Sequence, residues 1–354
     1  IFIDASPQKN NVCHLAPSGY APYTAENRQG LSMTRAEFNY DFPHRRLVSI
    51  ADLNPLDVEI LFDRAEHWLE VCRTPAKKAD ALRGLTQINL FFEPSTRTQA
   101  SFEIAGKRLG ADVVNFSAAS SSTSKGETLL DTVRTLAAMN PDLLVVRHKA
   151  CGAATFIAEA TGIAVVNAGD GMNEHPTQAL LDAFTLTQRL GPLGGRRVLI
   201  VGDVLHSRVA RSGVLLLNLL GAQVRLCAPP TLLPLDADRW GADVFHDLDE
   251  ALEGCDAVMA LRLQQERMTS GYIPSLREYF RFYGLTEDRL EAASPGALVL
   301  HPGPMNRGVE IDSALADDAD RSLVLDQVEA GVAMRMAVLE AIGMLARKNE
   351  GRRS

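Results

Sequence analysis

The sequence predicts an α/β protein with two similar Rossmann-like domains, which are joined by interdomain helices. Each domain is expected to contain a parallel sheet flanked by helices. Short apolar runs alternate with amphipathic segments of helical period, as in parallel strands covered on both faces. These runs form two series, at about 86–170 and about 196–301. The length of 354 residues also suits two domains of ordinary size.

Eight apolar runs are the predicted strands. In the first series they are QINLFF, DVVNF, DLLVVR and AVVNA, and in the second RRVLIVGD, QVRLCAP, AVMALR and ALVLHPG. Ahead of them, Asn54 is a predicted N-cap with Pro55 at the first helical position. We therefore expect a helix to precede the first sheet.

Two further helices are expected to connect the domains. The segment HPTQALLDAFTLTQRLGPLGG joins the two series, and its helix should end at Gly191-Pro192. A last helix, from about Asp326 to Lys348, should return to pack on the first domain. Its apolar stripe consists of Val328, Val332, Met336 and Leu339.

The predicted organisation has three parts. Residues 1–42 are rich in Pro, Asn, Gly, Ser and Tyr without a regular period, so we expect a flexible N-terminal extension. The first domain is expected to comprise residues 43–183 plus 326–349, and the second domain residues 184–325.

Composition narrows the functional classes. The net charge of −8 argues against nucleic acid or an anionic membrane surface as the main partner. No apolar stretch approaches the ~20 residues of a membrane span, and the N-terminus has no signal-peptide pattern. The five cysteines are scattered without a CxxC pair, which is typical of reduced thiols in a cytoplasmic protein.

The stretch EPSTRTQASFE is the first candidate site. Ser95 or Thr96 can cap a helix whose N-terminal N–H groups and partial positive charge favour phosphate. Arg97 and the neighbouring hydroxyls, including that of Thr98, would complete a cradle for the dianion. The alternative is an ordinary helix cap beside a surface arginine.

Two more stretches could join such a site. In NEHPTQALLD, Pro176 makes His175 the N-cap, and Gln178 follows one turn later. The helix N-terminus should hold this histidine in its neutral, hydrogen-bonding form, although a purely capping histidine is equally consistent. In SSTSKGETLLDT, Lys125 lies in a loop that could close over an anion, and a solvated linker is the favoured alternative.

The second series offers arginines rather than a dinucleotide fingerprint. Gly202 is followed by Asp203 and then by Ser207-Arg208, without the spacing G-x-G-x-x-G. Arg208 therefore suits a smaller anion such as a carboxylate, or else a structural salt bridge.

Two strand ends complete the set. Arg262 and Gln264 share one side of an extended segment, and HPGP follows the last strand. Because ligand sites of α/β sheets lie at the carboxyl ends of strands, we expect these groups to meet. Several arginines, a neutral histidine and no obvious nucleophile indicate group transfer between anionic substrates. With no HExxH or paired cysteines, we expect no metal and no cofactor.

Taken in order, STRT with SFE, HPTQ and HPGPMNRGVEI closely resemble the aspartate/ornithine carbamoyltransferase family, from about Phe42 to Arg347. The segment LRLQ is similar to the aspartate enzymes, and the His-Cys-Leu-Pro motif and Ser-Met-Gly loop of ornithine enzymes are missing. The resemblance implies carbamoyl transfer from carbamoyl phosphate to L-aspartate in de novo pyrimidine biosynthesis. It makes the first domain the carbamoyl phosphate-binding domain and the second the aspartate-binding domain.

The resemblance also implies residue roles. The phosphate would be bound by Ser95, Thr96, Arg97 and Thr98. The carbamoyl group would be held by Thr98, Arg147, His175, Gln178 and the backbone of Gly303-Pro304. The aspartate carboxylates would contact Arg208, Arg262, Gln264 and Lys125. Catalytic roles fall on Arg97, Thr98, Arg147 and His175.

The family's assembly is implied as well. Ser121 and Lys125 match a loop that enters the neighbouring subunit's site, which implies a homotrimer, alone or assembled with regulatory or dihydroorotase-like chains. The competing hypotheses are a carbamoyltransferase for ornithine or another amine, a non-catalytic partner-binding subunit, and a nicotinamide dehydrogenase. The paired phosphate and carboxylate sites disfavour the second, and the missing glycine fingerprint disfavours the third.

Overall fold

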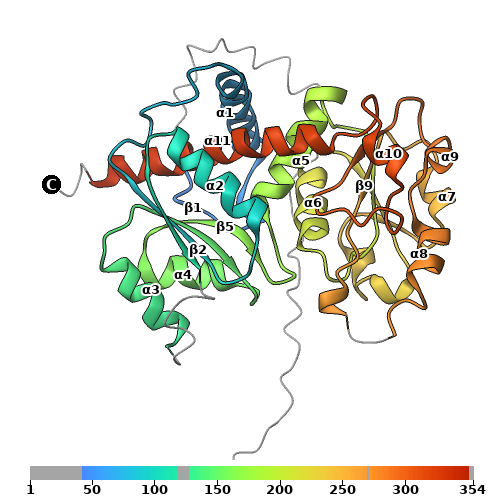
Figure 1. Cartoon of the computed structure of the whole chain (residues 1–354), viewed down its shortest axis with the longest axis horizontal. Coiled ribbons are helices and arrows are strands. Elements are labelled where there is room, and N and C mark those ends of the chain that lie inside the picture. The colour runs from blue at the N-terminus through green and yellow to red at the C-terminus, as the bar shows by residue number, and fades with distance from the viewer. Residues whose placement is uncertain (1–41, 118–126, 269–270, 351–354) are drawn as a thin grey trace, which may run out of the picture.

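The computed structural model describes residues 42–117, 127–268 and 271–350, which form two α/β lobes lying side by side (Figure 1). Each lobe contains one five-stranded sheet in which every strand pair is parallel. The predicted fold class is therefore confirmed.

The first sheet has the strand order β1-β5-β4-β2-β3. Its strands are β1 (Arg46–Leu47), β2 (Thr86–Phe91), β3 (Asp112–Ser117), β4 (Leu143–His148) and β5 (Ala164–Asp170). The second sheet has the order β10-β9-β6-β7-β8. Its strands are β6 (Arg197–Val201), β7 (Gln223–Cys227), β8 (Asp243–Phe245), β9 (Ala257–Ala260) and β10 (Leu298–Leu300).

The eight predicted strands all appear, and two more accompany them. The unpredicted strands, β1 and β8, have only two and three residues and are partly exposed. Such short edge strands carry no long apolar run, so periodicity could not reveal them. In contrast, every residue of β5 is buried, as expected of a central parallel strand.

The helices of the first lobe cover both faces of its sheet. They are α1 (Pro55–Arg73), α2 (Thr96–Arg108), α3 (Leu129–Ala137) and α4 (Ala153–Thr161). The predicted start of α1 is confirmed, because the Asn54 side chain accepts from the Asp57 N–H and the Asp57 carboxylate accepts from the Asn54 N–H. This reciprocal capping box satisfies two otherwise unpaired donors.

The second lobe contains five helices in its described residues, and most of them are short. They are α6 (Arg208–Leu219), α7 (Leu248–Leu252), α8 (Leu276–Tyr283), α9 (Glu287–Leu290) and α10 (Ser313–Asp317). Short 3₁₀ turns lie at Ile50–Asp52, Pro230–Leu232, Ala237–Arg239 and Gln265–Arg267.

Two helices connect the lobes. Helix α5 (Pro176–Leu190) leads from the first sheet to the second and ends before Gly191, as predicted. Helix α11 (Val324–Glu350) leaves the second lobe and crosses the first, where it contacts α1, α2 and α5 (Figure 1). The expected return to the first lobe is therefore seen.

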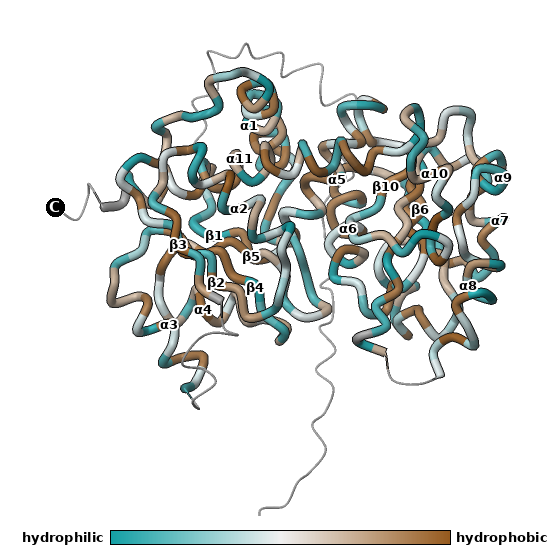
Figure 2. The backbone as a smooth tube through the Cα atoms, viewed as in Figure 1, coloured by the Kyte–Doolittle hydropathy of each residue, from teal (hydrophilic) through white to brown (hydrophobic). Residues whose placement is uncertain are grey.

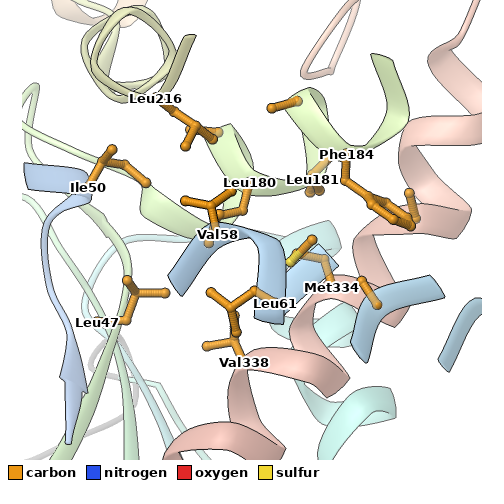
Figure 3. Close-up of a cluster of buried hydrophobic side chains, with 14 of the residues drawn as sticks. Leu47, Ile50, Val58, Leu61, Leu180, Leu181, Phe184, Leu216, Met334 and Val338 are labelled. Carbon is orange, nitrogen blue, oxygen red and sulfur yellow. The ribbon is translucent and has the colours of Figure 1, made fainter. Parts of the chain in front are cut away.

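A continuous hydrophobic cluster fills the junction of these helices. Figure 3 shows Leu61 of α1, Phe184 of α5 and Met334 of α11 converging, with Leu216 of α6 on the side of Leu180. The fully buried Met336 and Leu339 belong to the predicted stripe of α11, whereas Val328 is 59% exposed. The prediction was wrong for Val328, because the first turns of α11 border a cavity rather than the core.

The hydropathy along the chain matches this architecture, with apolar strands at the centre of each lobe and polar residues along the outer helices (Figure 2). In the described part of the chain, Cys72, Cys151, Cys227 and Cys255 are free. None of the described helices combines the length and apolar character needed to cross a membrane.

Candidate active site

A cavity of about 820 Å³ opens between the two lobes, at the carboxyl ends of the strands of both sheets. The predicted residues that line it are Ser95, Thr96, Arg97, Thr98, Arg147, His175, Gln178, Arg208, Arg262, Gln264, Gly303 and Pro304. The structure thus brings together every described residue that the sequence singled out. Ser121 and Lys125 lie outside the described residues.

The STRT segment forms the N-terminus of α2. Ser95 occupies the N-cap position, as predicted, but its side chain makes no capping hydrogen bond. Thr98 is buried, whereas Thr96 and Arg97 are exposed. First-turn N–H groups, hydroxyls and one exposed guanidinium therefore face the same cavity, an arrangement suited to a phosphate dianion.

The HPGP turn lies against this segment. Gly303 has a φ of +66°, and a Cβ added there would lie 3.5 Å from Nε of Arg97. A glycine adopts this left-handed backbone without steric cost. The Gly303 N–H donates to Nδ1 of His301 (2.9 Å), and the Gly303-Pro304 peptide bond is cis.

Glu93 was not among the predicted site residues. Its carboxylate accepts hydrogen bonds from arginines of both lobes. Arg147, at the end of β4, donates to its Oε1 over 3.3 Å. Arg208 binds both carboxylate oxygens, at 2.6 and 3.2 Å. Arg267 adds a third donor to Oε1 at 3.1 Å. One negative charge therefore faces three positive charges, which leaves a net positive cavity wall.

The pKa values follow from this crowding. Burial would raise the pKa of Glu93, but the hydrogen bond from Arg208 and the three positive charges lower it. Burial, reinforced by the charge of Arg208, lowers the pKa of Arg147 to about 9. Burial and Arg208 likewise lower the pKa of Arg267. Added anionic charge in this cavity would relieve the repulsion among the arginines.

His175 caps α5 with Pro176 at the first helical position, as predicted. The residue is 3% exposed, and its backbone N–H donates to Oγ of Ser212 (2.9 Å). The buried ring atom Nδ1 has no hydrogen-bond partner. Burial lowers its pKa well below the usual range, and the charges of Arg147, Arg335 and Arg208 add to the effect. The ring is therefore neutral, chiefly because of burial and surrounding arginines rather than the helix terminus alone.

The second lobe contributes its own polar groups to the cavity. Arg208 is the first residue of α6, behind the N-cap Ser207. Arg262 and Gln264 follow β9 and line the cavity together. The Gln264 side chain donates to the backbone carbonyl of His206 (3.0 Å). The backbone N–H of Gln264 donates to Oδ2 of Asp203 (3.2 Å). This segment is therefore anchored to the turn that precedes α6.

Several cavity residues escaped the sequence reading. They are Glu93, Arg267, His301, Gln327 and Arg335. Glu93 directly precedes the Pro-Ser-Thr-Arg-Thr run and Arg267 lies three residues after Gln264, so proximity to a motif was the available signal. Gln327 and Arg335 sit on α11, far from any motif, and only the tertiary fold brings them here.

The fold and this cavity define a two-domain α/β protein whose interdomain site is built for anionic ligands. Two family descriptions match the chain: "Aspartate/ornithine carbamoyltransferase, carbamoyl-P binding domain" over residues 45–188, and "Aspartate/ornithine carbamoyltransferase, Asp/Orn binding domain" over residues 194–342. Together they span most of its length, and the chain belongs to the aspartate/ornithine carbamoyltransferase family.

Individual relatives are close. The aspartate carbamoyltransferase catalytic subunit of Maricaulis maris is 70% identical over 316 residues, covering 89% of this chain and 99% of the relative. That of Parvibaculum lavamentivorans is 61% identical over 312 residues, covering 88% and 95%.

Solved structures agree in fold. Aspartate transcarbamoylase from Trypanosoma cruzi, in complex with carbamoyl phosphate and aspartate, has a TM-score of 0.74 and 33% identity, covering 84% of this chain and 96% of that one. Ornithine carbamoyltransferase from Pyrococcus furiosus has a TM-score of 0.75 and 26% identity, covering 85% and 97%. The backbone is thus common to both branches, and the high sequence identities point to the aspartate branch.

Proposed function

We propose that this chain transfers the carbamoyl group of carbamoyl phosphate to L-aspartate, yielding N-carbamoyl-L-aspartate and phosphate, a step of de novo pyrimidine biosynthesis. One observation carries the proposal. The α2 terminus with Arg97 belongs to the first lobe and Arg208 and Arg262 belong to the second, and the two parts line one cavity. Each part suits one anionic substrate, and the reacting groups would meet between them.

The proposed reaction is a direct acyl transfer. The neutral amine of aspartate attacks the carbamoyl carbon, so that a C–N bond forms while the bond to the phosphate oxygen breaks. The carbonyl oxygen gains negative charge near Thr98, Arg147 and His175, and the amine proton passes to the departing phosphate. Each well-aimed donor of this kind contributes about 3–4 kcal/mol to transition-state stability.

The neutral state of His175 fits this role. An imidazole whose pKa is lowered by burial and by Arg147 offers a hydrogen bond without a competing positive charge. Ser95, Thr96, Arg97 and Thr98 would hold the phosphate before and after transfer. Gln178 and the turn at Gly303-Pro304 would hold the carbamoyl nitrogen, and Gln264 would support the aspartate carboxylates.

The domain division is part of the proposal. Residues 43–183 plus 326–349 would bind carbamoyl phosphate, residues 184–325 would bind aspartate, and residues 1–42 would be a flexible extension outside them. The packing of α11 on α1 and α2 supports placing the C-terminal helix with the first domain.

We also propose that the protein works in the cytoplasm as a homotrimer, alone or in a larger assembly with regulatory or dihydroorotase-like chains. Ser121 and Lys125 of one subunit would complete the site of its neighbour, with Lys125 contributing to aspartate binding. The family resemblance of the loop sequence supports this arrangement.

A product assay tests the proposed activity. The purified protein is given carbamoyl phosphate with either L-aspartate or L-ornithine, and N-carbamoyl-L-aspartate and citrulline are quantified by chromatography. The proposal predicts N-carbamoyl-L-aspartate as the dominant product. Dominant citrulline would assign the chain to ornithine instead, and no product with either amine would favour a non-catalytic subunit.

A further inference from the structure

A buried carboxylate outside the predicted site, that of Asp182, connects two walls of the cavity. Asp182 lies on α5 one turn after Gln178 and is only 3% exposed. Its Oδ1 accepts from Nε2 of Gln178 (2.9 Å) and from Nε2 of Gln327 on α11 (2.6 Å). A single oxygen atom thus receives hydrogen bonds from two side-chain amides that both line the cavity.

This arrangement fixes which end of the Gln178 amide faces a ligand. A glutamine amide has a donating NH₂ end and an accepting carbonyl end. Because Oδ1 of Asp182 accepts, the NH₂ end is turned towards it, and the carbonyl Oε1 is the end left for the cavity. A flipped amide would place two oxygens against each other in a buried setting, which is costly.

The Gln327 amide links Asp182 to the HPGP turn by hydrogen bonds. Gln327 uses its NH₂ end for Asp182, and its Oε1 accepts from the backbone N–H of His301 (2.9 Å). His301 in turn accepts from the Gly303 N–H. The HPGP turn, whose residues line the cavity, is therefore tied to the same carboxylate.

We propose that Asp182 is a positioning residue that keeps the cavity's carbamoyl-facing groups as hydrogen-bond acceptors, and thereby selects carbamoyl phosphate over acyl phosphates that lack an N–H. The inference rests on the proposed function. A carbamoyl group presents an NH₂ that can donate to such acceptors, whereas the otherwise similar acetyl group presents a methyl group that cannot. A site built around acceptors rejects the analogue because its buried polar groups stay unpaired.

The orientation of the Gln178 and Gln327 amides does not depend on the charge of Asp182. Burial raises its pKa to about 7, so both protonation states occur near neutrality. Its Oδ2 is buried and has no hydrogen-bond partner. A proton would therefore reside on Oδ2, and Oδ1 would keep accepting from Gln178 and Gln327.

The test compares carbamoyl phosphate with acetyl phosphate in a double-mutant cycle. For wild type, Asp182→Ala, Gln178→Ala and the double variant, the KM for carbamoyl phosphate and the competitive Ki of acetyl phosphate are measured at saturating L-aspartate. The selectivity is the ratio of Ki to KM. Thr185→Val is the matched control, because Thr185 is buried on the same helix and its hydroxyl donates only to the Leu181 carbonyl (2.7 Å).

An alanine at position 182 offers no acceptor to the Gln178 amide, which frees that amide to flip. Asp182→Ala should therefore lower the selectivity by about tenfold, Gln178→Ala should do the same, and Thr185→Val should leave it unchanged. The double variant should lose less selectivity than the product of the two single losses, because part of the effect of Asp182 passes through Gln178. If Asp182→Ala does not fold, Asp182→Ser is measured in its place and the same ratios decide.

Two results would overturn the inference. One is an unchanged ratio in a folded Asp182 variant, and the other is a double variant whose loss is the product of the two single losses, as a purely structural role predicts. Because the wild type is assayed for N-carbamoyl-L-aspartate in the same experiment, an inactive wild type overturns the proposed function itself. An active wild type with unchanged ratios overturns only the role of Asp182.

Discussion

The substitution Glu93→Gln removes the negative charge on which three arginines of the cavity converge. Glu93 follows β2 in the first lobe, whereas Arg208 and Arg267 belong to the second lobe. The neutral amide keeps the shape of the side chain, but it leaves three guanidinium groups facing one another. We therefore expect the second-lobe arginines to lose their fixed positions relative to Arg147.

The free-energy cost of Glu93→Gln depends on how deeply the ion pair is buried. Removing one partner of a fully buried ion pair costs about 3–5 kcal/mol, and an exposed pair contributes about 0–1 kcal/mol. The Glu93 side chain is 23% exposed and that of Arg208 is 7% exposed, so an intermediate cost of about 1–3 kcal/mol is expected. If this cost falls on the positioning of the arginines proposed to bind aspartate, kcat/KM for L-aspartate should decrease about 5–150-fold.

The assay is the initial rate of N-carbamoyl-L-aspartate formation at saturating carbamoyl phosphate and varied L-aspartate. Glu103→Gln is the matched control, because Glu103 forms a surface ion pair with Lys107 at α2, and its loss should change kcat/KM less than about threefold. A Glu93→Gln variant that stays within twofold of wild type, or that gains activity, would refute the reasoning, since the carboxylate would then not organise the site.

Three further predictions concern Arg97, the proposed shared site and Asp182. Arg97→Ala should lower kcat/KM by about 10²–10³-fold without unfolding the protein, and an activity within threefold of wild type would remove Arg97 from the proposed cradle. Mixing inactive Lys125→Ala and Arg97→Ala subunits should restore part of the activity through hybrid trimers, whereas fully inactive mixtures would contradict a shared site. Because burial raises the pKa of Asp182 to about 7, the folded protein binds its proton more tightly than the unfolded chain does. Wild type should therefore lose stability relative to Asp182→Asn as the pH rises from about 4 to about 7. Urea unfolding at about pH 5 and about pH 8 measures this change, and an equal difference at both values would contradict it.

The parts of the fold that local chemistry determines could be predicted from the sequence. Strands buried on both faces, such as β5, read as unbroken apolar runs, and the caps of α1 and α5 are marked by Asn54-Pro55 and His175-Pro176. The short edge strands β1 and β8 have no such signal. The stripe on α11 was right where the helix crosses the core and wrong at Val328, because periodicity does not show where a core ends.

The candidate site, too, could be predicted only in part from the sequence. Residues that the motifs singled out for phosphate and for carboxylates lie in one cavity, because strand ends of parallel sheets collect at one edge. The pairing of Glu93 with Arg208 joins residues 115 positions apart in different lobes. The hydrogen bond between Asp182 and Gln327 spans 145 positions. Such contacts depend on how α5, α6 and α11 pack, which no local pattern in a single sequence specifies.

The most direct test of the central claim is a crystal structure of this protein with N-(phosphonacetyl)-L-aspartate bound. This molecule carries a phosphonate and two carboxylates on one short chain, so it reports both halves of the cavity at once. We expect the phosphonate at residues 95–98 and the carboxylates at Arg208 and Arg262. A phosphonate bound elsewhere, or carboxylates that contact neither arginine, would contradict the assignment of this cavity to carbamoyl transfer.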